Sequence, residues 1–125
     1  MSIVLTDREL DIMTALWERG PSTVGEVREH LTDELAYNTV LTMLRILEEK
    51  GYAGRTEEGR AHRYHAAVER EAAGRNALTR LVDGLFGGSA ELLLTNLVND
   101  KKMKRSDIQR LRNALDARLK KDSSK

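Results

Sequence analysis

The chain has 125 residues, a length typical of one domain or of one small domain with an oligomerisation extension. Its 40% hydrophobic content is enough for a core, and its net charge of +1 is far from the strongly basic balance that by itself indicates nucleic-acid binding. The chain contains no cysteine, which excludes disulfides, thiolate metal sites and a cysteine nucleophile.

No stretch of the sequence is typical of targeting or of membrane insertion. Residues 1–5 meet a charged segment too soon for the apolar core of a signal peptide. No apolar run approaches the roughly 20 residues of a membrane span. We therefore expect a soluble, cytoplasmic protein.

Helix-start patterns predict two short helices at the beginning of the chain. The first begins after Thr6, whose hydroxyl can accept from the amide of Glu9 in a capping box, and it ends at Gly20. The same pattern at Thr23 and Glu26 opens the second helix. Their inner faces are predicted from apolar residues at helical spacing: Leu10, Met13, Leu16 and Trp17 in the first, and Val24, Val27 and Leu31 in the second.

A third helix is predicted from about residue 37 to residue 50, closed by Gly51. Its inner stripe is Val40, Leu44 and Leu47, which leaves another set of side chains outside: Tyr37, Asn38, Thr39, Thr42, Met43 and Arg45. Extended runs at residues 52–56 and 60–65 flank a turn at 57–59 and predict a β-hairpin. Three short helices followed by a hairpin are the layout of a winged helix, a mainly α fold with a small β-hairpin.

The second half is predicted to be helical throughout. We expect a helix from about residue 69 to 86, a leucine-rich helix over 91–98, a polar connector, and a last helix capped by Ser106 and Asp107, with a frayed tail from residue 120. Residues 1–67 would then form a winged-helix DNA-binding domain and residues 68–125 a helical dimerisation region. Seven apolar side chains are predicted to mediate dimerisation: Leu81, Leu85, Leu93, Leu97, Ile108, Leu111 and Leu115. Packing of these helices onto the chain's own first domain is the alternative.

The third helix has the chemistry of a DNA recognition helix. Short polar side chains let a helix approach base edges, and Asn38 can pair bidentately with adenine. The hairpin adds cations that can lie along phosphates: Arg55, Arg60, His62, Arg63 and His65. A solvated helix and a solvated hairpin, without DNA, are the plainer interpretations. Glu57 and Glu58 argue against deep insertion of the hairpin into the minor groove.

Other chemistry finds little support. His62 and His65 would point to opposite faces of a strand, and no further ligand completes a metal site, so we expect neither a metal nor a cofactor. The sequence contains no recognisable nucleophile–base pairing and no glycine-rich phosphate loop. We therefore expect that the protein is not an enzyme.

Four segments carry a resemblance to a known family. Residues 5–17, 23–27, 36–51 and 58–64, with Ala36-Tyr37-Asn38-Thr39-Val40 at the start of the third helix, closely resemble the penicillinase-repressor family of the BlaI, MecI and CopY type. The resemblance covers nearly the whole chain and is densest up to about residue 86. It implies a homodimeric winged-helix repressor on palindromic operators with TACA/TGTA-like half-sites, controlling β-lactamase, copper-homeostasis or other stress operons.

The resemblance also implies which residues meet DNA. Four of them would lie on the recognition helix, with Arg45 near a phosphate and two more in the wing: Tyr37, Asn38, Thr39, Thr42, Arg60 and Arg63. Relatives often have Ser or Thr where this chain has Asn38, so the base preference is expected to differ. Ile46 stands where a basic residue is common, which implies one fewer backbone contact.

Two departures concern regulation. Copper-responsive members carry a C-terminal cysteine cluster, and this chain has no cysteine, which excludes copper sensing by that route. Antibiotic-responsive members are cleaved at an Asn-Phe bond through a membrane-sensor protease system. The nearest match is Asn96-Leu97, a candidate cleavage site that would make such a system a partner.

The sequence thus predicts a transcriptional repressor that binds double-stranded operator DNA as a homodimer. The alternative is a winged-helix adaptor that binds only proteins. An adaptor would be expected to have an apolar outer face on the third helix, which Asn38, Thr39 and Thr42 contradict. Activation rather than repression stays open, because it depends on where the operator lies.

Overall fold

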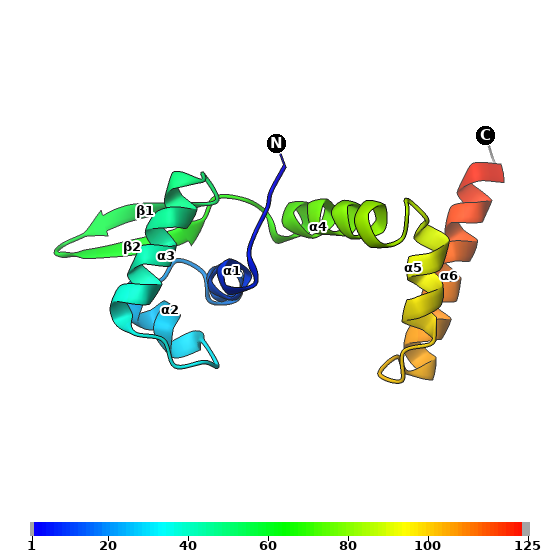
Figure 1. Ribbon diagram of the computed structural model, residues 1–125, viewed down its shortest axis with the longest axis horizontal. Coiled ribbons are helices and arrows are strands. Elements are labelled where there is room, and N and C mark those ends of the chain that lie inside the picture. The colour runs from blue at the N-terminus through cyan, green and yellow to red at the C-terminus, as the bar shows by residue number, and fades with distance from the viewer. Residues whose placement is uncertain (1, 124–125) are drawn as a thin grey trace. The chain divides into compact units, whose positions relative to one another are not determined.

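The computed structural model describes residues 2–123, and the chain divides into two compact units, Met1–Thr79 and Arg80–Lys125. The helices and strands of each unit are labelled in Figure 1. The division falls within α4 (Arg70–Leu85), whereas the sequence suggests a boundary between residues 67 and 68.

The first helix, α1 (Asp7–Arg19), begins with the predicted capping box, in which Thr6 and Glu9 exchange both hydrogen bonds. Glu9 is only 4% exposed, and Lys50 reaches it from the far end of α3 at 2.7 Å. Burial raises the pKa of Glu9, but the hydrogen bonds from Lys50 and Thr6 outweigh it, so the pKa lies below its usual value. The predicted inner stripe is corrected at Leu10, which is 46% exposed. Two residues that the sequence pattern did not select, Ile12 and Ala15, are fully buried instead.

The next two helices have the predicted inner faces. In α2 (Val24–His30), Val24 and Val27 are buried behind a second capping box. In α3 (Tyr37–Glu49), Val40, Leu44 and Leu47 are fully buried. Lys50 is the C-cap of α3, and Gly51 follows with φ of 82°, a conformation that other residues rarely adopt.

The hairpin consists of β1 (Ala53–Glu58) and β2 (Ala61–Ala66), which pair antiparallel. Glu58 faces Ala61, so only Gly59 and Arg60 form the connection, and Gly59 has φ of 63°. The prediction of a turn over 57–59 is therefore corrected, because the ladder extends through Glu58. Ser22 adds an isolated bridge to Tyr64, with two backbone hydrogen bonds of 2.8 Å.

The core of the N-terminal unit lies between these elements. The helix α1 packs on α2, α3 and β2, and α3 packs on α2 and β1. Tyr64 of β2 and Ile12, Met13 and Leu44 of the helices are the largest fully buried side chains there. Trp17 donates to the carbonyl of Val68 at 3.0 Å. This arrangement of three helices and a hairpin is a winged helix, as predicted.

The second unit is helical. The end of α4 is followed by Gly87 and Gly88, both with positive φ, then by α5 (Ala90–Val98) and α6 (Arg105–Ser123). The helix α6 begins at Arg105, and it continues through residues 120–123, where a frayed tail was predicted; residues 124–125 lie outside the described part. No residue within α5 or α6 is buried. Over residues 2–123, no single helix is long and apolar enough to cross a membrane; α4 and α5 together reach that length and composition, with a 99° bend between them.

Candidate nucleic-acid interface

The outer face of α3 is exposed and polar. Because Val40, Leu44 and Leu47 fix the inner face, the candidate recognition residues point to solvent: Tyr37, Asn38, Thr39, Thr42 and Arg45. Within residues 2–123, no side chain of these five is held by a hydrogen bond or an ion pair. Met43 instead packs partly buried against the core. The predicted residues therefore lie together on one surface and are free to bind a partner.

The N-terminus of α3 differs from those of α1 and α2. Its N-cap residue, Ala36, makes no side-chain hydrogen bond, and its first turn contains no acidic residue. In the capping boxes of the other two helices, the hydroxyls of Thr6 and Thr23 accept from the amides of Glu9 and Glu26, whose carboxylates accept in turn from the amides of Thr6 and Thr23. The Thr39 amide donates to the Ala36 carbonyl at 3.1 Å, which leaves the Tyr37 and Asn38 amides without an acceptor among the described residues. The positive end of a helix favours an anion there.

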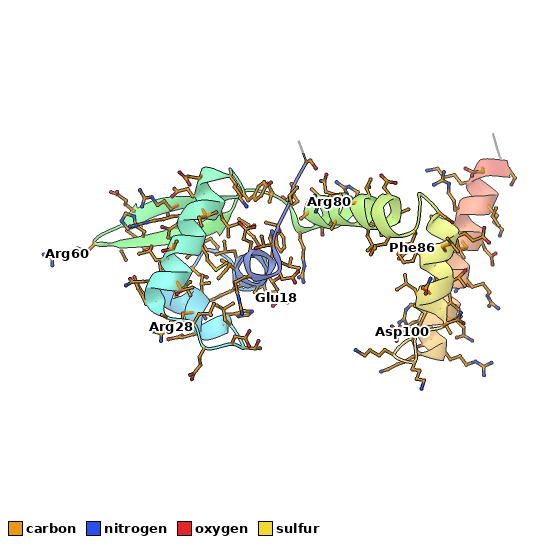
Figure 2. All side chains as sticks on the ribbon, viewed as in Figure 1. Glu18, Arg28, Arg60, Arg80, Phe86 and Asp100 are labelled. Carbon is orange, nitrogen blue, oxygen red and sulfur yellow. The ribbon has the colours of Figure 1, made fainter. Side chains whose placement is uncertain are left out.

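The two candidate wing arginines have different surroundings. Arg60 lies at the hairpin tip, exposed, and no ion pair within residues 2–123 involves it (Figure 2). Arg63 is held on three sides: its Nε donates to Glu58 at 2.8 Å, and its Nη1 donates to Glu26 and to the carbonyl of Pro21, each at 3.1 Å. Glu58 raises the pKa of Arg63. Arg60 is therefore free of carboxylate partners in the described residues, whereas Arg63 ties the hairpin to the start of α2.

Glu26 joins two cations and the start of α2. Its carboxylate accepts from the Thr23 amide at 2.9 Å, from Arg19 at 2.8 Å and from Arg63 at 3.1 Å. The Thr23 amide and then Arg19 lower the pKa of Glu26 from 4.5 to about 2. The sequence pattern places Glu26 in a capping box, but only the folded chain brings Arg63 to it.

The other three candidate residues of the hairpin, Arg55, His62 and His65, lie beside other groups of the protein. Arg55 pairs with Glu48 at 3.4 Å, at the end of α3. The His65 ring covers Gly54 across the ladder, so close that a Cβ on Gly54 would lie 2.6 Å from its Nε2. The Nδ1 atom of His62 is buried without a hydrogen-bond partner in the described residues. Over residues 2–123, no group of three His, Cys, Asp or Glu side chains could hold a metal ion.

The candidate dimerisation residues are mostly exposed within the second unit. Exposed fractions reach 77% at Leu85 and 47% at Leu115, with intermediate burial at Leu93 and Leu111; the remaining three are Leu81, Leu97 and Ile108, all exposed. The candidate cleavage pair, Asn96 and Leu97, lies near the end of α5. The side-chain amide of Asn96 donates to the carbonyl of Leu92, one turn earlier in α5, at 2.8 Å.

The chain is similar to known regulators. A family model described as penicillinase repressor matches residues 5–117. The transcriptional regulator BlaI of Mycobacterium tuberculosis is 43% identical over 63 residues, covering 48% of this chain, and the chain thus spans about half (46%) of that relative's length. The methicillin resistance regulatory protein MecI of Staphylococcus aureus is 20% identical over 89% of this chain and 92% of MecI.

A solved structure adds to these relatives. The Bacillus licheniformis BlaI in its monomeric form, in complex with the blaP half-operator, is 27% identical with a TM-score of 0.50, over 58% of this chain and 90% of that chain. The family model extends over both units, and the N-terminal unit has the fold that the sequence pattern predicts. The chain belongs to the penicillinase repressor family.

Proposed function

We propose that the protein is a transcriptional repressor, without catalytic activity of its own, that binds operator DNA through α3 and the hairpin. The observation that carries this proposal is the outer face of α3, where five exposed side chains, most of them polar, are left without partners in the described residues. A polar surface on an otherwise well-packed helix suits base edges better than an apolar protein partner. The similar BlaI of Bacillus licheniformis is bound to a half-operator, which supports DNA as the partner.

In this proposal α3 enters the major groove. Asn38 and Thr42 contact base edges, Arg45 contacts a phosphate, and the free amides at the start of α3 contact another. Arg60 lies along the backbone from the hairpin tip, where a cation releases condensed counterions. The paired Arg63 holds the hairpin against α2 instead of contacting DNA.

Dimerisation through the second unit completes the proposal. The helices α5 and α6 bury none of their own residues, although their apolar side chains are large and numerous. A second copy of the chain is the occupant that covers such faces on both partners at once, and obligate homodimers commonly bury more than roughly 2,000 Å². Two N-terminal units related by a two-fold axis would bind a palindromic DNA site. Its half-sites would lie about one turn of the DNA helix apart, or a multiple of that distance.

Fluorescence anisotropy tests the function. A labelled duplex with the protein's own promoter region is titrated over a salt series, against a scrambled duplex of the same length and composition. We expect a preference of about a thousandfold or more for the promoter, a steep loss of affinity with salt, and two chains per duplex. Equal, weak binding to both duplexes would refute sequence-specific repression and favour the adaptor.

Two variants test the recognition face. Asn38→Ala and Thr42→Ala should each lose about 1–3 kcal/mol of discrimination between promoter and scrambled duplexes. Thr79→Ala is the matched control, because Thr79 is exposed on α4 and bonds only the carbonyl of Arg75. Unchanged discrimination in both variants would show that α3 does not read the bases.

Release by proteolysis is a second part of the proposal. A protease needs an extended backbone, so cleavage after Asn96 requires the last turn of α5 to open. Because α5 is exposed, this opening costs few contacts. Loss of the chain beyond residue 96 removes α6. Two N-terminal units that are no longer joined then bind DNA more weakly, because they lose the effective concentration that the dimer provides. A chain ending at Asn96 that bound the promoter as tightly as the full chain would refute this part.

A further inference from the structure

One aliphatic side chain lies exposed on α3. Ile46, in the third turn of the helix, is 39% exposed, whereas Val40, Leu44 and Leu47 of the same helix are fully buried. Within residues 2–123, Ile46 belongs neither to the core nor to the partly buried layer that packs against it. Single apolar side chains are common on protein surfaces, so the surroundings of Ile46 decide whether it has a role.

The neighbours of Ile46 on the helix surface are two threonines of the outer face of α3. Residues that are three, four or seven apart share one side of an α-helix, so Thr39, Thr42 and Ile46 form one row. Both threonines are exposed, and each carries a methyl group beside its hydroxyl. Side chains of a helix lean towards its N-terminus, which brings Ile46 over the turn of Thr42. The row is therefore a strip of methyl groups along a face that is otherwise polar.

The side chain of Ile46 is also stiff. A β-branched residue within a helix has one strongly preferred χ1 rotamer. Holding Ile46 against a partner therefore costs less conformational entropy than holding the long, exposed side chain of Arg45 beside it. No atom of an isoleucine side chain donates or accepts a hydrogen bond. Ile46 can thus recognise a partner only through contact with an apolar group.

The base edges in the major groove of DNA offer one methyl group. They present hydrogen-bond donors and acceptors, and only thymine adds a methyl group, at C5. Against a donor or an acceptor, Ile46 would displace water without replacing its hydrogen bond, which is unfavourable. Against the thymine methyl group, burial of both apolar surfaces is favourable. The chemistry of Ile46 therefore favours thymine over the other bases, by attraction and by penalty together.

We propose that Ile46 determines part of the operator sequence, because its side chain contacts the C5-methyl group of one thymine in each half-site. Asn38 and Thr42, nearer to the N-terminus of α3, contact the edges of neighbouring base pairs. This inference rests on the proposed function, since it needs α3 in the major groove. It goes further by naming the base and the chemical group that Ile46 recognises.

Uracil interference tests the contact, because uracil is thymine without the C5-methyl group. The promoter duplex is prepared with uracil at sparse, random thymine positions. Bound and free duplexes are then separated with the full-length wild type and with Ile46→Ala. We expect one thymine in each half-site at which uracil weakens binding by the wild type but not by Ile46→Ala. This experiment needs no previous knowledge of the operator.

Two defined duplexes then measure the size of the effect. They differ only at that position, with thymine or uracil in both half-sites. Because the contact of one methyl group changes an affinity by about fourfold, uracil should weaken binding of the wild-type dimer by about 15-fold in total. Ile46→Ala should bind the thymine duplex at least as weakly as the wild type binds the uracil duplex, and should bind both duplexes equally.

The variant and its control are both expected to fold. Ile46 is exposed, and alanine is the best helix former, so Ile46→Ala should keep α3 intact. Leu10→Ala is the matched control, because Leu10 is an exposed leucine of α1, at 46%. It should leave both the affinity and the uracil interference pattern as in the wild type.

Two results would overturn the inference while the proposed function stands. If the wild type prefers the promoter but has the same uracil interference pattern as Ile46→Ala, then Ile46 contacts no thymine methyl group. If Ile46→Ala binds the thymine duplex as tightly as the wild type, then Ile46 lies away from the DNA. A wild type that binds promoter and scrambled duplexes alike would refute both the inference and the proposed function.

Discussion

At the scale of single residues, the arginines of the N-terminal unit divide by their partners. Arg19, Arg55 and Arg63 are tied to carboxylates of neighbouring elements, whereas Arg45 and Arg60 are in no ion pair of the described residues. A paired guanidinium must give up its carboxylate before it binds a phosphate, and a free one has no such cost. On α3 and the hairpin, the free Arg45 and Arg60 are therefore the arginines that we assign to DNA, whereas the paired Arg63 positions the hairpin.

Arg45→Ala tests this division. We expect weaker binding to promoter and scrambled duplexes alike, and a salt slope smaller by about one unit, because one phosphate contact is lost. Arg75→Ala removes an exposed arginine of α4 and should leave both quantities unchanged. Anisotropy titrations over a salt series measure both variants. A slope unchanged by Arg45→Ala would place this residue away from the DNA backbone.

Glu26 makes stability depend on pH. Its pKa falls from 4.5 to about 2 in the folded chain, so the stabilisation is complete above pH 4.5 and is lost as the pH falls toward 2. Glu26→Gln should unfold more easily than the wild type at neutral pH, and the difference should shrink through that window. Denaturant unfolding at several pH values measures it. Glu29→Gln, an exposed neighbour one turn further on, is the control and should change little. A constant difference between wild type and Glu26→Gln down to pH 2 would contradict the assigned pKa.

At the scale of elements, the sequence correctly predicts those features that depend on residues close together in the chain. Both capping boxes, the inner face of α3 and the hairpin follow from residues close in sequence, and the structure confirms them. The side of α1 that is buried depends on packing against α2, α3 and β2, and therefore the pattern wrongly placed Leu10 inside. The length of the turn at the hairpin tip was not predicted either, because Gly59 is compatible with a turn of two or of three residues. Only the pairing register of β1 and β2 shows that the turn has two residues.

The β1–β2 ladder contains a close approach that tests the hairpin. A Cβ on Gly54 would lie 2.6 Å from the His65 ring, which is the far end of a movable side chain. Gly54→Ala should cost about 1 kcal/mol of unfolding free energy, as the ring is displaced. In a His65→Ala background the same change should cost little, so a double-mutant cycle should show coupling of about 0.5 kcal/mol or more. Additive effects in thermal or denaturant unfolding would show that His65 does not cover Gly54.

At the scale of the whole molecule, the two units differ in how much of their apolar surface a single chain can bury. The N-terminal unit has a core of fully buried side chains, whereas α5 and α6 bury none of their own residues. The sequence predicts this contrast, since apolar faces on two helices exceed what one small unit can cover. The exposed, mostly polar outer face of α3 was also predictable. The pairing of Arg63 with Glu26 was not predictable, because it needs residues far apart in sequence to meet.

The proposed homodimer gives the last prediction. Leu115→Asp places a charge on the apolar face of α6, at a position 47% exposed in the single chain. If a second copy covers that face, the buried carboxylate should raise the dimer dissociation constant by at least about a hundredfold, with each head still folded. The promoter should then be bound with lower affinity, because two independent heads lose the effective concentration of the pair. Sedimentation equilibrium and anisotropy measure the two effects.

The matched control is Leu10→Asp. Leu10 is 46% exposed, almost the same fraction as Leu115, but it lies on α1 in the N-terminal unit. Because the two leucines are almost equally exposed in the single chain, a difference in dimer dissociation between the two variants reports which leucine a second copy of the chain covers. Leu10→Asp should leave the sedimenting mass of the dimer unchanged. A dimer that survived Leu115→Asp but dissociated with Leu10→Asp would move the interface from the C-terminal helices to α1, and two recognition helices would then need a different spacing on DNA.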